Sequence, residues 1–296
     1  MAKTKTVYVC TDCGSEYARW LGQCTDCKAW NTISEFRQAK APARGGNFAG
    51  FAGVTEAKVQ TLDAIDLTEL PRFSSAFNEF DRVLGGGIVP GSAILIGGEP
   101  GAGKSTLLLQ TMCALADQMP ALYITGEESL QQVAMRAKRL GLPTNKLQML
   151  SETSVENICN IAAKEKPRII VIDSIQVMHM SDIQSAPGSV SQVRESAAYL
   201  TRFAKQHHVA MILVGHVTKD GSLAGPKVLE HCIDCSIMLE GTTDSRYRTL
   251  RGHKNRFGAV NELGVFAMTG SGLKEVKNPS AIFLSRSDEQ TPGSVV

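Results

Sequence analysis

The chain has 296 residues, enough for one large α/β domain and a smaller one. Its 31 basic and 29 acidic residues give a net charge of +2, which excludes a protein that coats nucleic acid by bulk charge. The longest apolar runs, such as Ile169–Ile172 and Ala210–Val214, are too short to span a bilayer, and no apolar stretch follows Lys3 and Lys5 as a secretion signal requires. We therefore expect a cytoplasmic protein with no membrane partner, whose eight cysteines serve as thiols and metal ligands.

The N-terminal residues 1–36 contain two Cys-x-x-Cys pairs separated by ten residues. Four thiolates at this spacing can surround a zinc ion tetrahedrally. A segment this small cannot bury enough apolar surface to fold alone, so bound metal would supply most of its folding free energy, about 10 kcal/mol or more. We predict a zinc ribbon over 1–36, with redox thiols as the alternative. The expected zinc ligands are Cys10, Cys13, Cys24 and Cys27.

Other aromatic and cysteine residues need separate interpretation. Trp20 and Trp30 are expected to pack over the zinc site, although exposed tryptophans could instead stack on nucleic acid bases. Cys232 and Cys235 look like a third Cys-x-x-Cys pair, but positions three apart on a strand point to opposite faces. We therefore predict buried strand cysteines there and no second metal site.

Residues 37–60 are rich in Ala and Gly, contain a duplicated Phe-Ala-Gly, and show no amphipathic period. This composition is typical of a flexible linker. From residue 61 onward, short apolar runs alternate with helical segments, the pattern of a mostly parallel sheet flanked by crossover helices. We assign an α/β domain to 61–286 and a polar tail to 287–296.

Several runs in this domain read as strands. Their nearly continuous apolar sequences are expected of strands buried on both faces. The predicted buried strands are 93–98, 121–125, 168–173 and 210–216, and later strands, expected to add antiparallel at one edge of the sheet, are 232–240, 247–253 and 263–269.

Helices between these strands carry start signals. The first is expected over 106–116. Ser129, with Gln132 three residues later, forms a capping box for a second helix. Thr153, with Glu156, is expected to open a third. A fourth is expected over about 190–206. Each places apolar residues on a single face, as a helix packed on a sheet requires.

Residues 98–105 read Gly-Glu-Pro-Gly-Ala-Gly-Lys-Ser and match the pattern GxxxxGK[ST] between a strand and a helix. Glycines let several backbone N–H groups point at one anion, and the helix dipole adds to that field. We predict that Lys104 bridges the β- and γ-phosphates of ATP and that Ser105 ligates Mg²⁺. The predicted ATP-binding residues of this loop are Gly98, Glu99, Pro100, Gly101, Ala102, Gly103, Lys104, Ser105 and Thr106.

Polar residues follow the other buried strands at the same sheet edge. Asp173 ends the strand 168–173 and is expected to reach the Mg²⁺ shell. Glu127 follows 121–125 and is predicted to be the general base, with Glu128 auxiliary. The alternative is that both acids only stabilise the N-terminus of the following helix. His216, at the end of 210–216, could sense the γ-phosphate or be an ordinary polar residue at a strand end.

The motifs together resemble one family. They are the two cysteine pairs, GGEPGAGKST (97–106), YITGEES (123–129), VIDSIQ (171–176) and KNRFG (254–258). Over its whole length the chain resembles the RadA (Sms) family of bacterial DNA repair and recombination ATPases. The resemblance implies a RecA-like core in a hexameric ring similar to replicative helicases, movement on single-stranded or branched DNA driven by ATP hydrolysis, branch migration of recombination intermediates, and RecA recombinase as a partner.

The family continues into a C-terminal domain similar to the Lon protease fold. This chain ends at Val296, where that domain would begin, so the expectation is that it is absent. Lys254 and Arg256 of KNRFG lie two apart and would share a face of an extended strand. We expect them to act as catalytic cations on the ATP of a neighbouring subunit, which requires a head-to-tail interface. The alternative is a solvated basic strand.

Two Gly/Ser/Pro-rich loops are candidates for DNA contact. One covers 180–191 and the other 218–227, where Lys219 and Lys227 could pair with phosphates. Both are expected to be mobile when no DNA is bound, and ordinary surface loops are the alternative.

Two further functions remain open at this point. One is a RecA-like regulatory switch that gates protein partners without moving DNA. The other is a scaffold that binds nucleotide without appreciable hydrolysis.

Overall fold

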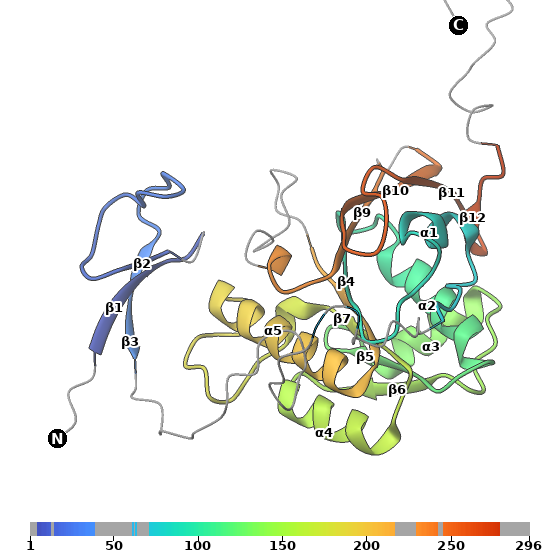
Figure 1. The fold of residues 1–296 in the computed structure, drawn as a ribbon, viewed down its shortest axis with the longest axis horizontal. Helices are drawn as coiled ribbons and strands as arrows, with labels where there is room; N and C mark the ends of the chain where they lie inside the picture. Colours follow the sequence, from blue (N-terminus) through green and yellow to red (C-terminus); the bar gives the residue numbers. More distant parts are fainter. Residues whose placement is uncertain are drawn as a thin grey trace, which may run out of the picture.

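The computed structural model describes residues 5–12, 15–38, 61, 63, 71–216, 229–241 and 245–278. The polar tail 287–296 and positions 39–60 of the predicted linker lie outside these ranges. The N-terminal part forms an antiparallel sheet of order β2-β1-β3 (Figure 1, blue), built from β1 (Lys5–Cys10), β2 (Glu16–Tyr17) and β3 (Ile33–Gln38). Strand β3 thus includes residues 37 and 38, which the sequence analysis gives to the linker, because their backbones pair with Thr6 and Lys5.

The second unit is built on a large sheet of order β12-β11-β10-β9-β4-β8-β7-β5-β6. The strands from β9 to β6 in this order are mutually parallel, whereas β10, β11 and β12 add antiparallel at one edge, as expected. The strands are β4 (Ala93–Gly97), β5 (Ala121–Thr125), β6 (Gln148–Ser151), β7 (Ile169–Asp173), β8 (Ala210–Val214), β9 (Cys235–Glu240), β10 (Tyr247–Asn255), β11 (Leu263–Thr269) and β12 (Gly272–Glu275).

Helices cover both faces of this sheet (Figure 1). Alternate residues of the central strands pack to opposite sides, because successive strand side chains point to opposite faces. Ile94 and Ile96 of β4 join the cluster on the α1 and α2 side, while Leu95 joins the one on the α4 and α5 side. The helices are α1 (Asn78–Val83), α2 (Lys104–Ala116), α3 (Leu130–Arg139), α4 (Val155–Glu165) and α5 (Val190–His207), with a 3₁₀ turn η2 (Ile175–Val177).

Two helix start signals can be compared with the structure directly. The capping box at Ser129 is present, with the Ser129 side chain accepting from Gln132 N and the Gln132 side chain accepting from Ser129 N. Helix α4 begins one residue later than predicted, since its cap is Ser154, which accepts from Asn157 N. Thr153 is instead held by the side chain of Glu152, so the prediction that Thr153 caps this helix is wrong.

The cysteine pair at 232 and 235 also differs in detail from the prediction. Cys232 lies in a turn before the strand, and its thiol donates to the carbonyl of Leu229, while Cys235 begins β9. Both thiols are buried, so the prediction of core cysteines holds although they do not share a strand. Burial raises the pKa of Cys235 to about 12. Among the described helices none is long and apolar enough to cross a membrane.

The parallel strands bring four loops to one sheet edge. Strands β4, β5, β7 and β8 run in the same direction, so the segments that leave their carboxyl ends meet there. Ligands of open α/β sheets bind at such an edge.

Candidate active site

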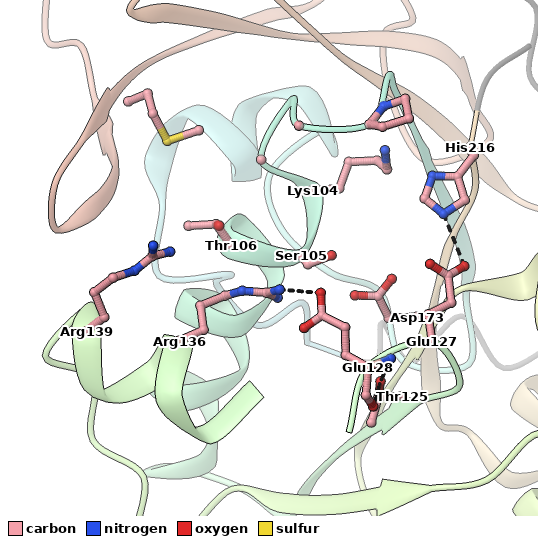
Figure 2. A pocket seen from close by; sticks show the side chains of 14 residues that line it. Lys104, Ser105, Thr106, Thr125, Glu127, Glu128, Arg136, Arg139, Asp173 and His216 are labelled. Atoms are coloured by element: carbon pink, nitrogen blue, oxygen red, sulfur yellow. Dashed lines mark hydrogen bonds and ion pairs between the residues drawn. The ribbon is translucent and has the colours of Figure 1, made fainter. Parts of the chain in front are cut away.

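A cavity of about 390 Å³ opens at this edge (Figure 2). It receives residues from the loop after β4, from the ends of β5 and β7, from the segment after β8, and from α3 and β11. The residues that line it are Pro100, Gly101, Gly103, Lys104, Ser105, Thr106, Thr125, Glu127, Glu128, Arg136, Arg139, Asp173, His216 and Met268.

The loop after β4 turns sharply into α2 at Gly103. This residue caps the helix with φ of 106°, a left-handed conformation that favours glycine. A Cβ at this position would also lie 2.8 Å from Cε of Met268. The turn places the N-terminus of α2 at the cavity, and a helix N-terminus is suited to binding phosphate.

Lys104 is the first residue of α2, and its side chain is only 5% exposed. Its Nζ donates to the carbonyl oxygens of Gly98 at 2.6 Å and Glu99 at 3.0 Å. Burial lowers the pKa of Lys104, and the nearby carboxylates of Asp173 and Glu127 oppose that shift. The ammonium is therefore held inside the loop, where phosphates would sit.

Asp173 ends β7, and one of its oxygens accepts from the Tyr123 hydroxyl at 2.5 Å. Burial first, and then the Asp173 charge, raises the pKa of Tyr123 well above its ordinary value, so Tyr123 stays a neutral donor. Ser105 lines the same cavity as this carboxylate (Figure 2). A hydroxyl and a carboxylate oxygen are ligands that Mg²⁺ accepts, so Ser105 and Asp173 fit the predicted magnesium site.

Glu127 lies at the end of the cavity next to His216 (Figure 2). The Oε1 atom lies 3.2 Å from His216 Nε2 and also accepts from the Ser174 hydroxyl. These two hydrogen bonds, the one from His216 above all, hold the pKa of Glu127 below its ordinary value despite partial burial. Because an ionised carboxylate only accepts, Nε2 of His216 carries the proton. Glu127 is thus an ionised carboxylate with a fixed orientation.

Glu128 lines the same cavity but is engaged differently. Its carboxylate pairs with Arg136 of α3, and its backbone N–H and carbonyl both bond the Thr125 hydroxyl. One oxygen of Glu128 and one guanidinium nitrogen of Arg136 have no partner among the described residues. This carboxylate is oriented toward α3, whereas the Glu127 carboxylate is held by His216 and Ser174.

The cavity includes residues that the sequence analysis missed. Arg136 and Arg139 lie three apart on one face of α3, which is the one local signal that could have indicated them. Met268 comes from β11, and Thr125 is the last residue of β5. Three predicted ATP-binding residues, Gly98, Glu99 and Ala102, do not line the cavity.

Lys254 and Arg256 do not lie in this cavity either. Lys254 Nζ donates to the carbonyl oxygens of Glu230 and Ile233, and Arg256 pairs with Asp234 at 3.1 Å. Asp234 also accepts from the N–H of Ala93, at the opposite end of β4 from the predicted phosphate-binding loop 98–105, the phosphate loop. The two cations therefore converge on the segment 230–234, far from the phosphate loop of the same subunit.

The N-terminal sheet gathers its cysteines. The sulfurs of Cys10, Cys24 and Cys27 all lie within 4.8 Å of one another, and the first and last are 3.6 Å apart. Tetrahedral Zn–S bonds of about 2.3 Å require sulfur separations of about 3.8 Å, so these thiols fit zinc. The predicted fourth ligand, Cys13, lies outside the described residues.

Trp20 and Trp30 do not pack over this centre, so that prediction is wrong. Their exposed fractions are 56% and 70%, and both rings flank Gly22. Tyr17 takes the place expected of a tryptophan, with its hydroxyl 3.0 Å from the Cys24 sulfur. The alternative that the tryptophans stack on bases stays open.

Comparison with known proteins identifies the fold of the second unit. Residues 60–222, more than half of the chain, match the family described as AAA domain. The chain belongs to the AAA domain family. Residues 8–35 match a second family, described as rubredoxin metal binding domain, which coincides with the cysteine cluster.

Curated relatives cover the whole chain. It is 72% identical to the DNA repair protein RadA of Haemophilus influenzae, 71% identical to that of Escherichia coli and 47% identical to that of Bacillus subtilis. Each comparison covers 100% of this chain and 65% of the relative. The chain thus spans 65% of the length of these proteins, slightly less than two thirds.

The expected resemblance to RadA proteins is confirmed over the whole chain. The predicted fold class is confirmed as well, since a mostly parallel sheet flanked by helices follows a small cysteine ribbon and matches an AAA domain.

Proposed function

We propose that this chain hydrolyses ATP as part of a motor that acts on single-stranded or branched DNA in homologous recombination and repair. The observation that carries the proposal is the convergence of Lys104, Asp173 and Glu127 on one cavity, in a chain 72% identical to a DNA repair protein. The phosphate loop and the base come from different strands, β4 and β5, and the parallel sheet brings them together.

The residues divide the work of hydrolysis. The N–H groups of the loop and Lys104 hold the phosphates, and Mg²⁺ held by Ser105 and Asp173 would neutralise charge on the transferring group. Glu127 takes a proton from the attacking water as the water oxygen bonds to the γ-phosphorus and the bond to the bridging oxygen breaks. His216 holds Glu127 in place and is the last described residue before the predicted DNA loop at 218–227.

The first candidate DNA loop is tethered at its base. Gln192 of α5 is 2% exposed, and its side-chain nitrogen donates to the carbonyl oxygens of Met180, Ile183 and Ser185. Its side-chain oxygen accepts from the N–H of Met180. The segment 180–185 is therefore joined to the start of α5 by these hydrogen bonds. Contact of this loop with DNA stays a proposal, as do the roles of Lys219 and Lys227, which lie outside the described residues.

We further propose a head-to-tail hexameric ring, in which Lys254 and Arg256 of one subunit reach the ATP of the next. Their distance from the phosphate loop of their own subunit supports this arrangement, because a cation placed there can serve a nucleotide only across an interface. Zinc in the ribbon, a cytoplasmic location and RecA as a partner belong to the same proposal. The names of the relatives, DNA repair protein RadA, support its DNA part.

DNA binding tests the proposal against the regulatory switch. We expect fluorescently labelled single-stranded DNA to bind this chain with ATP present, and binding to be lost in Lys104→Ala. Unchanged anisotropy of the DNA at micromolar protein with ATP would leave the switch as the better account.

A second variant tests the scaffold. Glu127→Gln is expected to bind ATP and lower turnover by a factor of about 10² to 10⁴, the usual contribution of a general base. Turnover equal to that of the unsubstituted chain would favour a scaffold whose residual hydrolysis does not use this site. Glu128→Gln is the matched control and is expected to have the smaller effect.

A further inference from the structure

Arg248 lies behind the phosphate loop and belongs to none of the motifs described above. It stands on β10 and is 6% exposed. Its Nε donates to the carbonyl oxygen of Ala102 at 3.1 Å. Its Nη1 donates to the carbonyl oxygens of Ser245 and of Tyr247, the latter at 2.8 Å. The guanidinium thus joins the start of β10 to the middle of the phosphate loop.

No carboxylate among the described residues forms an ion pair with Arg248. A buried cation without a carboxylate is costly, even when carbonyl groups solvate it. The phosphates of a nucleotide in the adjoining cavity would supply the missing negative charge. Arg248 therefore adds a positive charge behind the loop, in addition to the charge of Lys104 in front of it.

The contact with Ala102 also sets the direction of a neighbouring donor. The carbonyl of Ala102 and the N–H of Gly103 belong to the same planar peptide unit, and in a trans peptide they point in opposite directions. Since the carbonyl points at Arg248, the Gly103 N–H points away from it. Gly103 lines the cavity, so this N–H faces the space that phosphates would occupy.

We propose that Arg248 is a positioning residue for nucleotide binding. It presets the Gly103 N–H toward the phosphates and contributes fixed positive charge to the cradle, without touching the nucleotide. The inference rests on the proposed nucleotide site and deepens it by naming a residue outside the loop that controls affinity for phosphate.

Gly241 gives an independent route to the same contact. A Cβ at this position would lie 2.5 Å from Cδ of Arg248 and 2.9 Å from the Tyr247 carbonyl oxygen that accepts from Arg248, so any other residue there would disturb the seat of the arginine. Gly241→Ala should therefore weaken nucleotide binding although it removes no functional group. It perturbs Arg248 without deleting it and complements the direct variants.

The test is the affinity of the whole chain for MgADP, measured by calorimetry. We expect Arg248→Met to weaken binding about tenfold or more, as loss of a charged hydrogen bond predicts, with Arg248→Lys intermediate because it keeps the charge. Arg251→Met is the matched control. Arg251 lies on the same strand, is exposed, and pairs with Glu240 at 3.5 Å. The affinity of the Arg251→Met variant for MgADP should therefore equal that of the unsubstituted chain.

A second readout separates positioning from plain structural support. The Tm of each variant is measured with and without MgADP. A merely structural role would lower the Tm without nucleotide and leave both the increment on adding MgADP and the affinity unchanged. The proposal predicts a smaller increment for Arg248→Met and Gly241→Ala, because the increment falls as affinity falls.

The outcomes are distinguishable. If the unsubstituted chain does not bind MgADP, the proposed function fails. If the unsubstituted chain binds it and Arg248→Met and Gly241→Ala bind within twofold of it, only the inference about Arg248 is overturned.

Discussion

At the scale of single residues, the proposed chemistry depends on Glu127 and on the two groups that hold it. The same oxygen accepts from His216 Nε2 and from the Ser174 hydroxyl, so the carboxylate is both ionised and oriented. Sequence alone indicated Glu127 and His216, because each follows a buried strand. It gave no sign of Ser174 as the third member, since that role depends on how β7 ends beside β5.

The pH dependence of activity tests this environment. The folded-state pKa of Glu127 is lowered, so the base stays ionised as pH falls until that lowered value is reached. His216→Ala removes the largest cause of the lowering, and the pKa should rise toward its ordinary value. We therefore expect the acid limb of kcat/KM to move to higher pH in His216→Ala. His253→Ala, at an exposed position on β10, is the control, and an acid limb that does not move would contradict the account.

Residues that shape the cavity from distant strands were the least predictable. Met268 reaches it from β11, more than 160 positions after Lys104, and Arg248 acts on Ala102 from β10. No local pattern marks either residue, because each owes its place to strand order in the sheet. The phosphate loop could be predicted because consecutive residues in the sequence determine its conformation.

At the scale of elements, buried parallel strands were predictable because continuous apolar runs mark them. Strands β5 and β7 lie within one residue of their predicted ranges. The edge strand β6 was missed because its four residues are partly exposed and give no apolar run. Helix α1 spans only six residues, too few for a helical period to show.

The tether of the loop at 180–191 gives a prediction at this scale. Gln192→Ala removes three donated hydrogen bonds and should release the loop. We expect weaker DNA binding and reduced stimulation of ATP hydrolysis by DNA, with hydrolysis in the absence of DNA retained. Gln206→Ala, an exposed glutamine on the same helix, is the matched control. Loss of DNA-free hydrolysis together with stimulation would contradict a role confined to the loop.

The ribbon gives a second prediction. Its described apolar cluster consists of little more than Cys10, Cys24 and Ile33, so removal of zinc should unfold it. The chain has two tryptophans, Trp20 and Trp30, both in the ribbon, so tryptophan fluorescence reports on this unit alone. A chelator should release one zinc per chain and shift this fluorescence while MgADP binding by the AAA domain persists.

Controls for the ribbon follow from the same contacts. Cys24→Ser should abolish stoichiometric zinc, whereas Cys113→Ser, a buried cysteine of α2, should retain it. The zinc assignment would be contradicted if the chain were purified without zinc and its tryptophan fluorescence did not change when the chelator was added.

At the scale of the whole molecule, the role proposed for Lys254 and Arg256 requires a second subunit. Both are held by the segment 230–234, away from the phosphate loop of their own subunit. A head-to-tail ring would place the cations of one subunit at the nucleotide of the next.

Mixing two inactive variants tests this arrangement. Lys104→Ala subunits keep the cations, and subunits carrying both Lys254→Ala and Arg256→Ala keep the phosphate loop. Each alone should lose about 10³ in rate. A random equal mixture should recover about a quarter of the normal rate, because that fraction of interfaces pairs an intact loop with intact cations. No recovery, although the variants melt normally and co-assemble, would contradict action across the interface.

The most direct test of the central claim is steady-state ATP hydrolysis with and without single-stranded DNA, with Lys104→Ala as the blank. The account predicts clear stimulation by DNA that disappears in the blank. Hydrolysis that is unchanged by DNA would contradict a DNA-coupled motor for this chain.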